Sequence, residues 1–141
     1  MIPALFARWL PSLFEEFPFL PRERPVWEFP GLLRELLPAL PEAEGYRCPE
    51  PGLCLHMSAV IEPGAVLKPP LLIGPGCFVA AHAYLRGGVV LAADVRIGPG
   101  CEVKASLVSS ETALAHLNFV GDSVIGRGVN IEAGAVLANS W

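Results

Sequence analysis

The chain has 141 residues and a formal net charge of −4 at neutral pH, with an isoelectric point near 5.3. This acidic balance disfavours nucleic acids and anionic membranes as partners. The mean hydropathy of +0.48 is high, yet no apolar run approaches a membrane span, and Glu15 and Glu16 break any signal-peptide pattern. We expect one domain with an appendage in a cytoplasmic protein, whose excess apolar surface is covered by other protein.

Residues 1–54 predict a helical arm. An apolar stripe follows Pro3 and stops at Pro11, and leucines at helical spacing predict a second helix from Pro30 to Leu40. Proline-rich connectors flank the second helix. We expect these helices to cap the open first coil of the repeat that follows, and a separate binding function is the alternative.

Residues 55–141 carry a six-residue repeat, which neither a helix nor an isolated strand produces. An aliphatic residue stands at every sixth position, at Ile61, Leu67, Ile73, Val79, Leu85, Leu91, Ile97 and Val103. The position four residues later is always apolar and mostly small, and turn residues such as Pro-Gly separate the units. After Val103 we expect the pattern to resume in a register shifted by two, at Leu107, Ala113, Phe119, Ile125, Ile131 and Leu137.

This pattern predicts an all-β fold, a left-handed parallel β-helix of hexapeptide repeats with about five coils and a short N-terminal helical cap. Three hexapeptides make one triangular coil, so residues eighteen positions apart stack at strand spacing, about 4.8 Å. One outer face, with Leu72 and Val90, is apolar. A homotrimer that buries this face is expected, unless the N-terminal helices cover it.

Three cations stand eighteen residues apart, at Lys68, Arg86 and Lys104. Stacked like charges repel, so an unpaired column of this kind favours an anion-binding site. The alternative is a solvated ridge that Glu62 and Glu102 neutralise.

The histidines and cysteines give weaker signals. His56, His82 and His116 share no column and no metal-ligand spacing, so we expect no metal site. His116 lies in a turn of the least regular coil, where an imidazole facing a cleft could serve as a general base, although a lone histidine is more often a bystander. No Cys-x-x-Cys pair occurs, and the four cysteines are expected to be free buried thiols.

The segment from Leu85 to Trp141 contains Leu-Arg at 85–86, Glu-x-Lys at 102–104 and AHLNFVGD at 115–122. In these motifs it resembles the acetyltransferase half of the bifunctional glucosamine-1-phosphate acetyltransferase / N-acetylglucosamine-1-phosphate uridyltransferase family. The resemblance implies that Arg86 and Lys104 bind a sugar phosphate, with Glu102 beside them and Lys68 in the same column. It also implies that His116 is the catalytic base.

The same resemblance extends to the C-terminal residues. The asparagine of the family motif Asn-Ile-x-Ala-Gly falls on Asn130, which implies a sugar contact, and a second site asparagine falls on Asn139. Ala133 of this motif is the implied contact for acetyl-CoA, the co-substrate. Family members form trimers with sites between subunits, so a homotrimer is again expected.

Departures from the family pattern leave two functions open. Phe119 replaces a tyrosine, Glu132 replaces a glycine, and the family continues beyond Trp141 with coils that supply much of its acetyl-CoA groove. No nucleotidyltransferase signature precedes the repeat. The chain is either an acetyl-CoA-dependent N-acetyltransferase acting on an amino-sugar phosphate, or a non-catalytic trimeric module that binds a sugar nucleotide or assembles with a pyrophosphorylase. Trp141 is expected to lie across the last coil as a lid.

Overall fold

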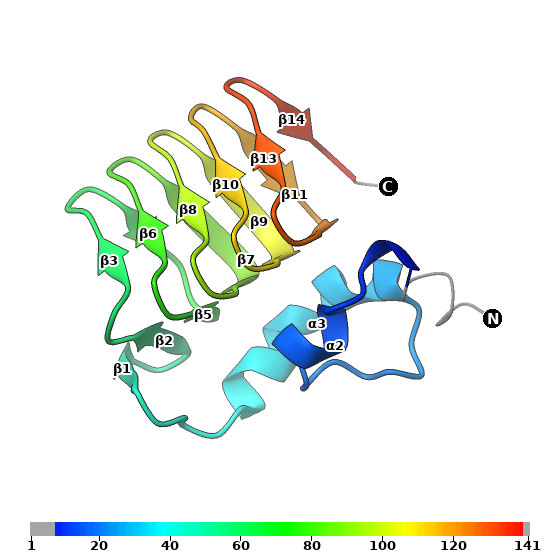
Figure 1. Cartoon of the computed structure of the whole chain (residues 1–141). Helices are drawn as coiled ribbons and strands as arrows, with labels where there is room; N and C mark the ends of the chain where they lie inside the picture. The colour runs from blue at the N-terminus through cyan, green and yellow to red at the C-terminus, as the bar shows by residue number, and fades with distance from the viewer. Residues whose placement is uncertain (1–7, 140–141) are drawn as a thin grey trace.

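A computed structural model describes residues 8–139 of the chain (Figure 1). The expectations for Pro3 and for Trp141 concern residues outside this range. Within it, short parallel strands wind into a three-faced solenoid of about five turns, which confirms the predicted β-helix. No helix in residues 8–139 combines the length and apolarity that crossing a bilayer requires.

Each face of the solenoid is a stack of parallel strands. The first face consists of β3 (Val60–Ile61), β6 (Phe78–Val79), β8 (Arg96–Ile97), β10 (Ala113–Leu114) and β13 (Asn130–Ile131). The second face consists of β2 (Leu53–His56), β5 (Leu71–Ile73), the C-terminal halves of β7 (Tyr84–Leu91) and β9 (Glu102–Val108), and β12 (Val124–Ile125). The third face consists of β4 (Val66–Leu67), the N-terminal halves of β7 and β9, β11 (Phe119–Gly121) and β14 (Val136–Leu137).

The core is the column of inward side chains that the repeat predicts. Leu85, Ile97 and Val103 are fully buried, and the small residues of the second inward position, such as Ala83 and Cys101, are buried with them. Burial of this apolar surface is the main stabilising contribution, and small side chains at the second position keep the narrow prism free of overpacking.

The predicted register after Val103 is wrong by one residue. Val89 pairs with Ser106, seventeen positions away, because the corner occupied by Gly87 and Gly88 in one coil holds the single residue Ala105 in the next. Ala105 turns this corner with a φ of 47°. Consequently Leu107, Ala113 and Phe119 point outward, and the inward residues are their neighbours Val108, Leu114 and Val120. Ile125 and Ile131 are inward as expected.

The N-terminal segment runs alongside the solenoid instead of covering its first coil (Figure 1). It contains α2 (Leu13–Glu16), the 3₁₀ helix η1 (Val26–Glu28), α3 (Phe29–Leu36) and the 3₁₀ turn η2 (Leu37–Ala39). Phe29 and Leu33 of α3 are fully buried in one cluster with the outward side chains Val90 and Leu107 of the second face. The apolar face of α3 therefore packs on the outer surface of the second face of the solenoid. The chain itself covers the apolar face that would otherwise argue for a trimer.

An antiparallel hairpin of β1 (Tyr46–Glu50) and β2 begins the solenoid. The predicted boundary between residues 54 and 55 falls inside β2 and stays a prediction. Cys48 and Cys54 form a disulfide across this hairpin, which corrects the expectation of four free thiols. Cys77 and Cys101 are free and buried as expected. Burial raises the pKa of the Cys77 thiol to about 11, so this thiol stays neutral and unreactive at physiological pH.

Glu16 joins α2 to the solenoid. One carboxylate oxygen accepts a hydrogen bond from the backbone N–H of Ser110 at 2.6 Å, and the other accepts one from the Ser12 hydroxyl at 2.6 Å. Burial raises the pKa of Glu16, but the hydrogen bonds from Ser110 and Ser12 outweigh it and the net pKa is lowered. The ionised carboxylate is therefore the form that the folded state prefers.

Glu16→Gln should lower the free energy of unfolding by about 1 kcal/mol at neutral pH, because a charged acceptor of two hydrogen bonds is lost. Since the folded-state pKa is lowered, this stabilisation is present above about pH 4.5 and is lost as the pH falls through the folded-state pKa. Urea unfolding of both proteins between pH 3.5 and 7 measures it, with the exposed neighbour variant Glu15→Gln as control. A pH-independent difference, or an equal effect of Glu15→Gln, would contradict the assignment.

Candidate functional site

The predicted cation column lies along one edge of the third face. Arg86 and Lys104 are direct neighbours on adjacent strands, and Lys68 follows β4 one coil earlier, where its backbone N–H bonds to the Leu85 carbonyl. In the next coil the equivalent position is Gly121, which pairs with Lys104. The predicted eighteen-residue spacing therefore holds from Lys68 to Lys104 and ends there.

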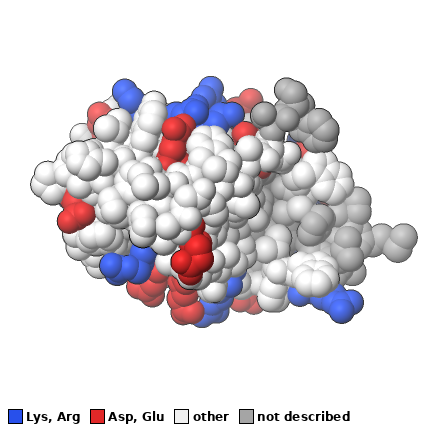
Figure 2. Space-filling model, turned by 90° about the horizontal axis from the view of Figure 1, so that it is seen from above, with Lys and Arg blue, Asp and Glu red and all other residues white. Residues whose placement is uncertain are grey.

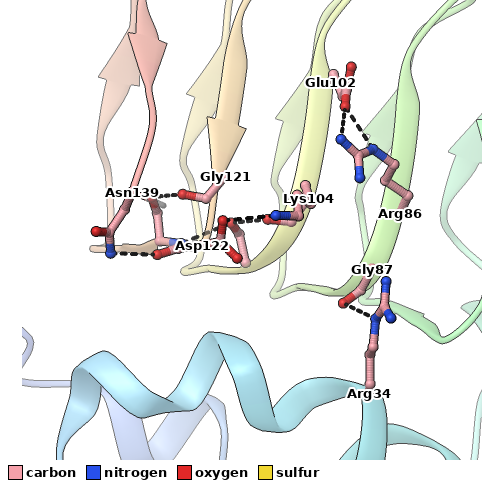
Figure 3. A network of polar contacts seen from close by, with 10 residues as sticks. Arg34, Arg86, Gly87, Glu102, Lys104, Gly121, Asp122 and Asn139 are labelled. Carbon is pink, nitrogen blue, oxygen red and sulfur yellow. Dashed lines mark hydrogen bonds and ion pairs between the residues drawn. The ribbon is translucent and has the colours of Figure 1, made fainter. Parts of the chain in front are cut away.

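Two cations of this column, Arg86 and Lys104, have carboxylate partners (Figure 3). Arg86 donates to Glu102 at 2.7 Å from two nitrogens, and Lys104 Nζ lies 3.1 Å from Asp122 Oδ2. The four side chains are between 30% and 35% exposed, so these pairs contribute little to stability and remain reachable from solvent. The expected neutralisation by Glu102 is therefore seen at Arg86. Glu62 instead accepts a hydrogen bond from the backbone N–H of Ala81.

Asp122 was missed by the sequence analysis, although it follows Lys104 by eighteen positions. Asp122 stands seventeen positions after Ala105 at the same corner and turns it with a φ of 51°. A count of eighteen from Lys104 lands on Asp122, but the sequence analysis followed only the cations along this column. The AHLNFVGD segment was the available signal, because it ends on this aspartate.

Asn139 lies beside Asp122, the partner of Lys104, as Figure 3 shows. Its side-chain amide donates to the Asp122 carbonyl at 3.2 Å. These three residues form one wall of a groove of about 480 Å³, and the other wall comes from η1 and the start of α3. That second wall contributes another ion pair, Arg24 with Glu28, and the indole of Trp27.

His116, Asn130 and Ala133 lie elsewhere. They gather at the corner between the first and third faces, where the turn after β10 stacks on the turn after β13. The His116 carbonyl accepts a hydrogen bond from Gly134, and the His116 side chain is exposed. The Asn130 amide donates to Glu132 Oε1 at 2.7 Å. The structure thus divides the predicted site residues into two groups, which the width of the third face separates within one chain.

Asn118 holds the His116 corner together and was not singled out by the sequence analysis. It is 3% exposed, and its amide donates to the carbonyls of Glu132 at 2.6 Å and Ala135 at 3.2 Å. Its side-chain oxygen accepts a contact from the Cys101 thiol at 3.5 Å. The asparagine therefore fixes the two turns that carry His116 and Ala133.

Charges of both signs lie close together on the surface. Figure 2 shows Lys and Arg beside Asp and Glu along the edges of the view, with uncharged surface between them. In residues 8–139 no three His, Cys, Asp or Glu side chains converge on a possible metal position. The groove beside Lys104 is therefore lined by two ion pairs, the side-chain amide of Asn139 and the indole of Trp27.

Comparison with known proteins matches residues 50–141 to the family described as GMPPB C-terminal domain. The chain is also similar to proteins named Bifunctional protein GlmU. It is 43% identical to that of Methylococcus capsulatus over 89 residues, which is 63% of this chain and 18% of the relative. It is 34% identical to that of Ruthia magnifica subsp. Calyptogena magnifica over 86 residues, which is 61% of this chain and 16% of the relative. The chain therefore spans less than a fifth of these relatives, and the resemblance seen in the sequence is confirmed.

Asn118→Ala should destabilise the protein by about 2 kcal/mol, because it removes the buried amide that donates to the carbonyls of Glu132 and Ala135. Asn130→Ala is the matched control on β13 of the next coil, where the side chain is exposed, and it should change the unfolding free energy by less than about 0.5 kcal/mol. Urea unfolding measures both. Equal effects of the two variants would show that Asn118 does not hold this corner.

Proposed function

Because the chain belongs to the GMPPB C-terminal domain family, we propose that it binds an amino-sugar phosphate in the groove beside Lys104. The observation that carries this proposal is the Lys104–Asp122 ion pair, with Asn139 on the same wall and the Arg24–Glu28 pair on the opposite one. Two cations and two carboxylates face one groove, so the groove suits a ligand that carries both signs of charge.

An amino-sugar phosphate such as glucosamine 1-phosphate has this charge pattern. Its phosphate would replace Asp122 as the partner of Lys104, and its ammonium group would take the carboxylate that this exchange releases. Breaking the Lys104–Asp122 pair costs little free energy, because a partly exposed ion pair contributes only about 0 to 1 kcal/mol. The Asn139 amide would meet sugar hydroxyl groups, which accept and donate hydrogen bonds.

The Arg86–Glu102 pair joins β7 to β9, the strand that also carries Lys104, and it repeats the same charge pattern. It extends the polar surface along the column toward Lys68, which is exposed. In this proposal Arg86 and Glu102 are a secondary part of the site that assists the capture of anionic ligands.

A second candidate function is N-acetyl transfer from acetyl-CoA. The gathering of His116, Asn130 and Ala133 on one corner favours it, because a base and a sugar contact are then close together. The amine would attack the thioester carbonyl, His116 would take the proton from the amine, and coenzyme A would leave as its thiol. This corner and Lys104 would have to meet across two subunits, as they would in the homotrimer that we propose for this protein in the cytoplasm.

Calorimetric titration of the purified protein tests the binding proposal. Glucosamine 1-phosphate should bind more tightly than glucose 1-phosphate, which lacks the ammonium group. Lys104→Ala should weaken glucosamine 1-phosphate binding about tenfold or more, because a charge-assisted contact to phosphate is lost. Lys68→Ala, in the same column but outside the groove, is the matched control and should leave the affinity within about twofold.

Equal affinity for the two sugar phosphates, or equal effects of the two lysine variants, would contradict the proposed site. Release of free coenzyme A from acetyl-CoA and glucosamine 1-phosphate, abolished in His116→Ala, would establish the second candidate.

A further inference from the structure

A separate hollow of about 290 Å³ lies at the start of the solenoid, where the chain leaves α3 and returns to the sheet at β1 (Figure 1). Its floor is formed by β2 and β5 of the second face, and its walls by the connector after α2, by η2 and by the segment that leads into β1. It shares no lining residue with the groove beside Lys104. The hollow is therefore a second site that the proposed function does not use.

Most of the lining is apolar, with Pro18, Phe19, Leu37, Leu40 and Leu72 among its residues. An apolar cavity of about 150 Å³ in a protein core can bind benzene, so about twice that volume has room for an aromatic ring with a short alkyl chain. Its size also lies near the lower end of the range of about 300 to 1,000 Å³ that is usual for ligand pockets. The hollow therefore fits a small ligand with an apolar body.

The ionisable groups of the hollow select the charge of such a ligand. Among the described lining residues these groups are Glu16, Glu42 and Tyr46, and Lys, Arg and His do not occur. Glu16 is ionised at neutral pH, as argued above, and Glu42 is exposed. Burial raises the pKa of the Tyr46 hydroxyl, so this group stays neutral. The hollow thus has a negative charge and disfavours phosphates and carboxylates.

An ammonium group matches these surroundings. Each carboxylate oxygen of Glu16 accepts one hydrogen bond, from Ser110 or from Ser12, and keeps a lone pair for a further donor. The aromatic rings of Phe19 and Tyr46 also attract cations through their π faces.

The walls of the hollow are held in place before any ligand binds. The Cys48–Cys54 disulfide joins β1 to β2, and the ring of Tyr46 packs edge-on against His56 with a centroid distance of 5.0 Å. The Glu16 contact with Ser110 fixes the end of α2. Binding therefore requires little ordering of the protein, which favours affinity for a small ligand.

We propose that this hollow binds a small hydrophobic amine, with its apolar body against Phe19, Leu40 and Leu72 and its ammonium group toward the carboxylates. The proposal goes beyond the sugar-phosphate function, because the two sites differ in every lining residue and in the charge they select. It gives the N-terminal segment a binding role of its own.

Calorimetric titration of the full chain at neutral pH with three ligands of similar shape tests the proposal. These are 2-phenylethylamine, the neutral 2-phenylethanol and the anionic 3-phenylpropanoate. The amine should bind about tenfold more tightly than the alcohol, because only the ammonium group gains from the carboxylates and the rings, and the anion should bind most weakly.

Glu42→Gln should weaken amine binding about threefold to fivefold, the loss of one partly exposed charge pair, and leave binding of the alcohol unchanged. Glu44→Gln is the matched control, because Glu44 is exposed in the same connector and is not among the residues that line the hollow. In NMR spectra the amine should shift the backbone amide signals of Ala43 and Gly52 and not those of Lys104 and Asn139.

Equal affinity for the amine and the alcohol, equal effects of the two glutamate variants, or amide shifts at Lys104 in place of Gly52 would each overturn the proposal. So would the absence of binding by all three ligands. Titration with glucosamine 1-phosphate reads the other groove, and this sugar phosphate should not displace the amine. Failure at one site therefore leaves the proposal for the other site standing.

Discussion

The packing of α3 on the second face of the solenoid is the contact on which the rest of this structure depends. Leu33 lies directly over Gly88, where an added Cβ would come within 3.0 Å of the Leu33 Cβ. The glycine also turns the corner with a φ of 95°, a conformation that other residues rarely adopt. Close approach buries the outward side chains Val90 and Leu107 and brings η1 opposite Lys104 and Asn139. One apolar contact thus both completes the fold and creates the candidate groove.

The repeat made most of the fold predictable, since an uninterrupted six-residue spacing leaves one architecture. Three features could not be predicted from the repeat, for physical reasons. A corner can be turned by Gly87-Gly88 or by Ala105 alone, and the sequence does not reveal that an alanine adopts a positive φ. Leu107 was assigned to the interior because an outward residue under a helix is as apolar as an inward one. The Cys48–Cys54 disulfide depends on the pairing of β1 with β2, which no spacing rule supplied.

The candidate site was predictable in its cations and in the partner of Arg86, but not in the partner of Lys104. Spacing alone brings Arg86 beside Lys104, but Asp122 lies at the corner after β11, and a column followed only through its cations did not include it. Arg24 and Trp27 lie about eighty residues before Lys104 in the chain, and only the docking of the N-terminal segment shows that they share a groove with it. His116 was singled out from its turn position and from its motif. It lies at another corner, because three residues of β11 separate the two edges of the third face.

The most direct test of this account is a crystal structure of the protein with glucosamine 1-phosphate bound. The account predicts that the ligand lies between η1 and the solenoid, with its phosphate at hydrogen-bond distance from Lys104 Nζ and its ammonium group at the carboxylate of Asp122 or Glu28. A ligand bound at the corner of His116 and Asn130, with the Lys104–Asp122 pair intact, would contradict it.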